Sequence, residues 1–316
     1  MGRCAFLFPG QASQYVGMAR DLHGRYPSVR ELFAQADACL GFSLSGVCFN
    51  GPEERLRQTA VTQPAVFVHG AAVWQLVAAA GVIPVAVAGH SLGEYVALVA
   101  AGALPLSDAL DLVKARGRLM QQAGEERPGA MAAVIGLEDG RVEELCLQVQ
   151  AEAGGEVVVP ANYNAPGQVV VSGSPAGVER LGLLAREAGA RKVTLLPVSG
   201  AFHSPLMQPA ADRLREMLWQ AGWQRPSVPV ITNVAAAPVA EPDELRRQLV
   251  EQITHPVRWT ESVQALSRTG VRLALELGPG SVLKGLVRRI DPELEVWSVG
   301  TVEELETSLD GIAKQV

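Results

Sequence analysis

Residues 82–93 read Val-Ile-Pro-Val-Ala-Val-Ala-Gly-His-Ser-Leu-Gly, an apolar and partly β-branched run that leads into a Gly-x-Ser-x-Gly pentapeptide. The run predicts a buried strand, and the apolar stretch over 94–101 predicts a helix after it. A serine in a strand-to-helix turn between glycines indicates a nucleophile elbow, in which the next N–H points toward a developing oxyanion. The pattern therefore predicts a catalytic serine, Ser91. The alternative is a tight glycine turn whose serine only caps a helix.

The composition is that of a globular protein with a substantial core. The chain has 316 residues, 48% hydrophobic and 19% charged, which suffices for one large domain or two unequal ones. Its net charge of −6 provides no basic field for nucleic acid or an anionic membrane. The four cysteines form no CxxC pair, and the N-terminus lacks a basic start followed by an apolar signal core. We therefore expect a cytoplasmic protein with reduced thiols.

One uncharged segment, residues 65–88, is long enough to cross a bilayer. Gly81 and Pro84 interrupt it, and a helix over 65–80 followed by a buried strand explains the same apolarity. The sequence therefore predicts no membrane span.

Strands alternate with helices on both sides of the elbow, a rhythm typical of a parallel sheet with helices on its faces. The first part of the chain predicts strand 4–8, helices 17–39, 53–58 and 65–80, strand 83–88, and helices 93–101 and 108–122, the last behind a Ser107 cap. Strands 228–232 and 272–276 and helices 205–221, 243–252, 258–268, 281–290 and 302–314 are expected to complete this unit.

A second unit is inserted after the polar stretch 124–129, whose proline and glycines are typical of a linker. Its predicted order is strand 130–136, helix 140–152, strands 156–161 and 168–172, helix 175–188 and strand 191–196. This βαββαβ order is that of a ferredoxin-like α+β domain. We expect a large domain formed by residues 1–126 and 198–316, and a small domain formed by residues 127–197.

A serine nucleophile needs a base, and five histidines are candidates. His203 follows a predicted strand and lies in a loop before a helix, where α/β folds place catalytic groups. His90 adjoins the serine, but its side chain is expected to point elsewhere across the turn. No acidic residue between 91 and 203 is a convincing third member of a triad, since Glu94 is explained by its place in the first turn of a helix. A Ser-His dyad is compatible with that absence, because a carbonyl or an amide can orient the histidine.

Arg116 lies beside the apolar stripe of the predicted helix 108–122. It can be read as a snorkelling side chain or a structural ion pair. The other reading is a bidentate clamp for a substrate carboxylate, which guanidinium geometry suits.

Seven motifs, spread over nearly the whole chain, together resemble the malonyl-CoA:acyl carrier protein transacylases, the acyltransferases of type II fatty acid synthesis. They are Phe8-Pro-Gly-Gln-Ala-Ser-Gln14, Gly89-His-Ser-Leu-Gly-Glu94, Arg116-Gly117, Gly129-Ala-Met-Ala-Ala133, Asn162-Tyr-Asn-Ala-Pro-Gly-Gln168, Ala201-Phe-His-Ser204 and Gln252-Ile-Thr-His-Pro256. Ala12 departs from the family pattern, which usually has glycine there. The resemblance implies an α/β fold in which a hydrolase-like large domain with a parallel sheet is interrupted by a ferredoxin-like small domain.

The resemblance also implies roles for the site residues. Ser91 attacks the malonyl thioester and His203 takes its proton, in a ping-pong mechanism through a malonyl-serine ester. Backbone N–H groups of Gln11 and Leu92 are expected to form the oxyanion hole. The main-chain carbonyl of Gln252 is expected to orient the histidine.

Three further residues are expected to bind substrate. Arg116 would pair with the free malonyl carboxylate, and Asn162 would lie near the cleft between the domains, although its Asn-Ala-Pro-Gly neighbourhood also reads as turn chemistry. Phe202, just before the histidine, fits malonyl rather than methylmalonyl selectivity, because the related methylmalonyl-selective enzymes tend to have a small residue there.

The expected partners are malonyl-CoA and, transiently, an acyl carrier protein, with no bound cofactor or metal, no nucleic acid, no membrane, and a monomeric state. Lys284, Arg288 and Arg289 recur at helical spacing and are expected to steer the acidic carrier, although a solvated helix face explains them almost as well. The alternatives are a methylmalonyl-selective or other polyketide acyltransferase, a serine carboxylesterase, and a non-catalytic acyl-CoA or carrier-binding module.

Overall fold

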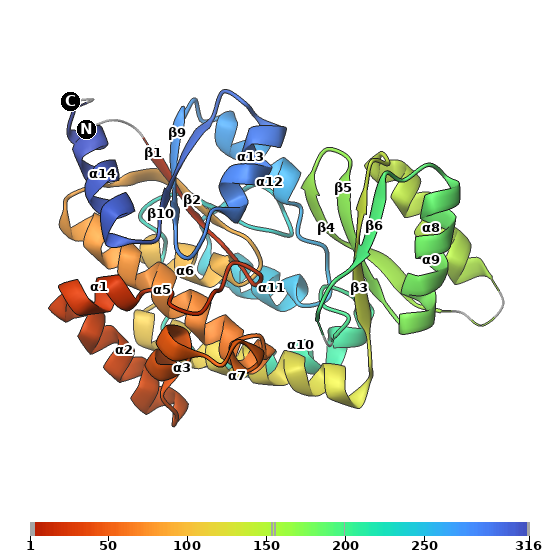
Figure 1. The fold of residues 1–316 in the computed structure, drawn as a ribbon, viewed down its shortest axis with the longest axis horizontal. Coiled ribbons are helices and arrows are strands. Elements are labelled where there is room, and N and C mark those ends of the chain that lie inside the picture. The colour runs from red at the N-terminus through yellow and green to blue at the C-terminus, as the bar shows by residue number, and fades with distance from the viewer. Residues whose placement is uncertain (1–3, 153, 155, 199, 315–316) are drawn as a thin grey trace.

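The computed structural model describes residues 4–152, 154, 156–198 and 200–314. These residues form two sheets that lie side by side, each with its own helices (Figure 1). The first and last thirds of the chain build the larger unit, and the middle of the chain builds the smaller one. The predicted fold class, an α/β protein with an inserted antiparallel unit, is confirmed.

The larger sheet has six strands in the order β10-β9-β1-β2-β7-β8 and is parallel except for the β7–β8 pair. Its strands are β1 Cys4–Phe8, β2 Pro84–Gly89, β7 Val230–Ile231, β8 Pro238–Val239, β9 Leu273–Leu277 and β10 Glu295–Val299. β1 and β9 are buried along their whole length, because helices cover both faces of the sheet, as expected of a parallel sheet.

The helices of this unit divide between two hydrophobic clusters, one on each face of the sheet. α12 and α13 contribute to the smaller cluster, and α5, α6 and α7 to the larger one (Figure 1). The helices are α1 Arg20–Arg25, α2 Pro27–Leu40, α3 Leu44–Asn50, α4 Glu53–Leu56, α5 Thr59–Ala79, α6 Gly93–Ala100, α7 Leu106–Glu126, the 3₁₀ turn η1 Pro205–Met207, α10 Gln208–Gln220, α11 Pro242–Gln252, α12 Trp259–Ser267, α13 Val282–Ile290 and α14 Val302–Ala313.

The smaller sheet is antiparallel throughout, in the order β4-β5-β3-β6. Two helices pack on it around a separate hydrophobic cluster. The elements are β3 Ala130–Ile135, α8 Asp139–Ala151, β4 Val158–Ala165, β5 Gln168–Gly173, α9 Pro175–Glu187 and β6 Lys192–Leu195. This is the predicted βαββαβ order with ferredoxin-like pairing.

Several local predictions are wrong. The helix expected over 17–39 is divided at Tyr26, which is extended in front of Pro27, as a residue before proline prefers to be. α7 begins at Leu106 after Pro105, so Ser107 is not its cap, and the helix continues through 124–126, where a linker was expected. The sequence reading also missed α3, β8 and β10.

Among the described helices, none alone is long and apolar enough to cross a membrane. One pair, α2 and α3, passes that test together by length and composition only, and it is bent by 117°. Residues 65–79 lie within α5, which is followed by β2, so the apolar segment consists mainly of a core helix and a core strand.

Candidate active site

The serine turn lies where two neighbouring parallel strands end. β1 pairs with β2 so that Phe8 lies opposite Gly89, and the N–H of His90 donates to the Phe8 carbonyl at 2.9 Å. Ser91 has φ 51°, a strained value for a residue with a side chain. A Cβ on Gly93 would lie 2.0 Å from the Phe8 oxygen, so this position requires glycine. The geometry is that of a nucleophile elbow.

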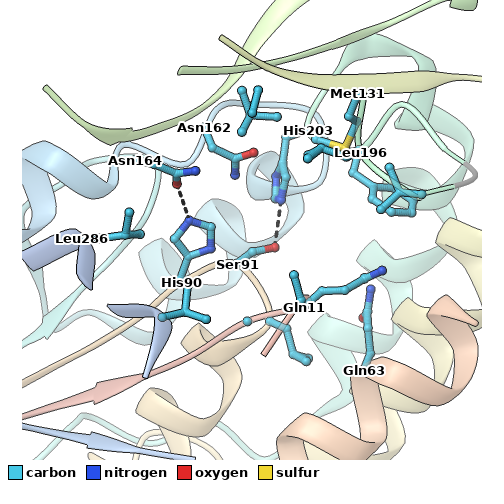
Figure 2. A pocket seen from close by; sticks show the side chains of 18 of the residues that line it. Gln11, Gln63, His90, Ser91, Met131, Asn162, Asn164, Leu196, His203 and Leu286 are labelled. Carbon is cyan, nitrogen blue, oxygen red and sulfur yellow. Dashed lines mark hydrogen bonds between the residues drawn. The ribbon is translucent and has the colours of Figure 1, made fainter. Parts of the chain in front are cut away.

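His203 lies in the loop after β6 and faces Ser91 (Figure 2). Its Nε2 lies 2.8 Å from Ser91 Oγ, and its Nδ1 lies 2.7 Å from the backbone oxygen of Gln252. A carbonyl can only accept, so Nδ1 carries the proton and Nε2 accepts from the serine hydroxyl. Burial, and then the positive charge of Arg116, lower the pKa of His203 to about 3. The imidazole is therefore neutral at physiological pH and available as a base.

Arg116, on α7, is only 1% exposed and contacts the nucleophile directly. Its NH2 group donates to Ser91 Oγ at 3.0 Å and to Gln252 Oε1 at 2.9 Å, and NH1 donates to Gln63 Oε1 at 2.8 Å. The guanidinium also lies 5.6 Å from the ring centre of Tyr95. It does not snorkel, and it makes no salt bridge within the described part of the chain. A buried cation bound by neutral amides is suited to receive an anion.

These groups open onto a cavity of about 260 Å³. The loop after β1 brings Gln11 to its wall, and the elbow contributes Leu92. Neither backbone N–H has an intramolecular acceptor among the described residues, so both remain available to an oxyanion. Ala12, where the resembling family usually has glycine, has φ 81°, a conformation that costs an alanine more than a glycine.

The small domain provides the opposite wall of the cavity. Asn162 of this domain lines the cavity, as does Phe202 beside His203, and both are at most 6% exposed. His90 also lines it, which the sequence reading did not anticipate. Its ring bonds to Asn164 Oδ1 at 2.8 Å and not to Ser91 (Figure 2). The elbow and the second sheet are thereby linked beside the nucleophile.

The structure adds three site residues that the sequence reading missed or set aside. Gln63 binds Arg116, and Asn233 Oδ1 accepts the Ser91 N–H at 2.6 Å. Glu94, which was explained by the helix dipole, is 1% exposed and bonded to the N–H of Asn233 and the amide of Gln252. Gln63 and Asn233 lie far from the motif in sequence, and no local pattern distinguishes them. Within the described residues, no group of three or more His, Cys, Asp or Glu could hold a metal ion.

Comparison with known proteins agrees with this geometry. The family model described as "Acyl transferase domain" matches residues 5–299. The malonyl CoA-acyl carrier protein transacylase of Escherichia coli strain K12 is 44% identical over 98% of this chain and 100% of its own length. The enzyme of the same name from Bacillus subtilis is 41% identical over 100% of this chain and 99% of its own length.

Solved structures are similar over the same extent. The malonyl-CoA:acyl carrier protein transacylase from Xanthomonas oryzae superposes with a TM-score of 0.94 at 46% identity, covering 98% of each chain. A malonyl-transacylase, solved in complex with a type II polyketide synthase acyl carrier protein, gives a TM-score of 0.94 at 41% identity, covering 98% of this chain and 100% of the other.

Proposed function

The chain belongs to the malonyl CoA-acyl carrier protein transacylases, a family of acyltransferases, and on that premise we propose that it carries malonyl as an ester of Ser91. One observation supports this assignment above the others. Ser91 Oγ accepts a hydrogen bond from Arg116 and donates one to His203 Nε2, at the wall of a cavity between the two sheets. A nucleophile, its base and a group that binds carboxylate thus meet at one oxygen atom.

In the first half-reaction, Ser91 Oγ attacks the thioester carbon of malonyl-CoA while its proton passes to His203 Nε2. The carbonyl oxygen becomes an oxyanion, which the N–H groups of Gln11 and Leu92 bind. Collapse of this intermediate breaks the carbon–sulfur bond. His203 returns its proton to the departing CoA sulfur, and malonyl stays esterified to Ser91.

The second half-reaction repeats these steps with a new thiol. The phosphopantetheine thiol of an acyl carrier protein gives its proton to His203 and attacks the ester carbonyl. The carbon–oxygen bond breaks, and Ser91 recovers its hydrogen from His203. The Gln252 carbonyl holds the imidazole in the same tautomer throughout, which explains how the site works without a triad acid.

Arg116 and Phe202 account for the choice of acyl group in this proposal. NH1 of Arg116 uses one of its two hydrogens on Gln63, and the NH2 hydrogen on Ser91 Oγ is released when that oxygen is acylated. One N–H of NH1 and one of NH2 are then free for the malonyl carboxylate. Phe202 fills space at the cavity wall, which disfavours a methylmalonyl group.

The main alternatives predict different behaviour. A carboxylesterase has no use for a buried arginine at its nucleophile, and it would release malonate to water. A non-catalytic binding module would form no covalent adduct. The direct test is incubation with malonyl-CoA, followed by intact-mass measurement and peptide mapping. One malonyl adduct on the peptide that contains Ser91, released by holo-acyl carrier protein but not by water, supports the transferase.

We expect the pH dependence of Ser91 acylation to reveal the lowered pKa of His203. An ordinary histidine would become protonated near pH 6.5 and stop acting as a base. Because the pKa of His203 is lowered, its neutral form persists to lower pH, so kcat/KM for acetyl-CoA should not fall around pH 6.5. A neutral acyl donor keeps the pairing of Arg116 with substrate out of the measurement.

The matched variant in this pH series is Arg116→Ala, which removes a charge that lowers the histidine pKa. Its acid limb should therefore move to higher pH, although burial still keeps it below the ordinary value. An acid limb near pH 6.5 in the parent protein, with unfolding excluded by circular dichroism at each pH, would contradict the proposed base.

The carrier protein is proposed to dock beside α13. Val282, Leu283 and Leu286 of this helix line the cavity, and Lys284 and Arg288 are exposed on it. Arg289, which was expected to join them, instead donates to the Pro166 carbonyl and the Gln168 side chain of the small domain. Lys284 and Arg288 therefore remain as the candidate steering charges.

Arg288→Glu should slow transfer to the acyl carrier protein severalfold at low salt without slowing acylation by malonyl-CoA. The reason is that the acyl carrier protein is the large acidic partner that α13 is proposed to steer. The two half-reactions are measured separately by quenched flow. Arg25→Glu is the control, since it makes the same charge change at an exposed position on α1. An equal response of both half-reactions to Arg288→Glu would contradict docking at α13.

The finer organisation of the protein also stays a proposal. We place the domain boundaries at 126/127 and 197/198; residues 1–3, 199, 315 and 316 of the large domain and 153 and 155 of the small one lie outside the described residues. Free thiols at all four cysteines fit a reducing, cytoplasmic location. A monomeric state is testable by light scattering.

A further inference from the structure

Glu94 is a buried carboxyl group that the mechanism above leaves without a role. It lies in the first turn of α6, three residues after the nucleophile, and is 1% exposed. Its Oε2 atom accepts the backbone N–H of Asn233 and the side-chain Nε2 of Gln252, each at 2.9 Å. A carboxyl group is rarely buried without a compensating contact. These two bonds provide that contact, and they link Glu94 to Asn233 and Gln252, which both bond to the backbone of Ser91.

The orientation of the Gln252 side chain depends on that contact. Its Nε2 also donates to the Ser91 carbonyl at 3.0 Å, whereas its Oε1 accepts from Arg116 NH2 at 2.9 Å. An ionised carboxylate and a carbonyl can only accept hydrogen bonds, so together they select the Nε2 end of the amide. The Oε1 end must then face the arginine. If the amide were reversed, two N–H donors would oppose each other at Arg116.

The contact between Glu94 and Gln252 also helps to compensate the positive charge of Arg116. Arg116 makes no direct ion pair within the described residues, yet a buried cation without a counter-charge is costly. Burial lowers the pKa of this guanidinium, and Tyr95 and the carboxylate of Glu94 act in the opposite direction. In turn, burial raises the pKa of Glu94 to about 7, while the Asn233 N–H, the Gln252 amide and Arg116 act in the opposite direction. Cation, amide and carboxylate form one chain of hydrogen bonds.

We propose that Glu94 is a positioning residue for malonyl selection, which fixes the Gln252 amide so that the Arg116 guanidinium is held, charged and oriented, beside Ser91. This inference rests on the proposed role of Arg116 as the clamp for the substrate carboxylate. Glu94 acts through Gln252 and touches no substrate. Its effect is therefore specific to acyl groups that carry a charge.

The variant that tests this role is Glu94→Gln, which keeps the shape of the side chain but adds an N–H donor that allows the Gln252 amide to reverse. At pH 8, above the pKa of Glu94, the ratio of kcat/KM for malonyl-CoA to that for acetyl-CoA should fall about tenfold, within the range of coupling between members of one hydrogen-bond network. In the Arg116→Ala background, the same change should leave the ratio within about twofold, because the group on which Glu94 acts is absent.

Glu276→Gln is the matched control. Glu276 is also a fully buried carboxyl group that accepts two backbone N–H groups, from Leu283 and Lys284, each at 2.8 Å, but it has no contact with Arg116 or Gln252. Its loss should lower the unfolding temperature and leave the malonyl to acetyl ratio within about twofold. Should Glu94→Gln fail to fold, Glu94→Asp replaces it in the cycle with Arg116→Ala, since the shorter side chain strains the same contact.

The outcomes separate this inference from the function on which it rests. A lower malonyl to acetyl ratio in Glu94→Gln, with no further decrease when the same change is made in Arg116→Ala, supports the positioning role. Equal loss of malonyl and acetyl transfer, or a loss that persists in Arg116→Ala, makes Glu94 a structural support of the elbow and overturns the inference alone. An unchanged ratio in Arg116→Ala itself would overturn the proposed clamp first.

Discussion

Ser91→Ala is expected to abolish the malonyl adduct and to lower malonyl transfer by roughly 10⁴-fold or more, because a nucleophile and its base act as one unit. The hydroxyl oxygen is the only protein atom in the proposed mechanism that bonds covalently to the acyl group. Without it, His203 Nε2 loses the donor that it accepts from at 2.8 Å, and Arg116 loses an acceptor at 3.0 Å. Intact-mass measurement after incubation with malonyl-CoA detects the adduct directly.

A serine outside the cavity provides the control for this experiment. Ser227 Oγ donates to the Ala101 carbonyl at 2.9 Å and does not line the cavity, so Ser227→Ala should still form the adduct. Circular dichroism and the unfolding temperature establish that Ser91→Ala is folded. A stable malonyl adduct on folded Ser91→Ala would place the nucleophile on another residue.

The parts of the fold that the sequence predicted well are those with local signals. β1 and β2 are short apolar runs that end at glycine or proline, and the elbow between β2 and α6 carries its own motif. β10 was missed because Glu295–Val299 is a short run that contains a glutamate and a serine, and it lies between two much stronger helical patterns. The break between α1 and α2 was missed because the helical period continues through Pro27, although proline restricts the residue before it.

The candidate site divides in the same way. Ser91, His203 and Arg116 could be selected from residue type and local context, and the structure brings them together. Gln63 and Asn233 could not, because their contacts arise from pairs 53 and 142 positions apart in the chain. Glu94 was misjudged for a physical reason. A carboxylate in the first turn of a helix already has a favourable interaction with the helix dipole, and sequence alone gives no sign that tertiary packing buries it.

Arg116→Ala is expected to lower malonyl transfer by about 2 to 5 kcal/mol of transition-state stabilisation, the usual cost of removing one partner of a buried charge pair. The substrate carboxylate would enter a cavity where it loses water, and Gln63 and Gln252 would offer it only the oxygen atoms that now face Arg116. Desolvation of the carboxylate would then have no compensation.

Acetyl transfer provides the internal reference for Arg116, because an acetyl group has no carboxylate to pair. In Arg116→Ala it should fall far less than malonyl transfer, or rise, since an acetyl-enzyme no longer leaves a buried cation without its anion. Arg116→Lys should recover part of the malonyl rate, because an ammonium restores the charge but not the two parallel N–H donors. The measurement is the ratio of kcat/KM values for malonyl-CoA and acetyl-CoA at fixed salt. If the ratio is the same in parent and Arg116→Ala, the arginine only supports the fold, and an esterase becomes the better reading of the elbow.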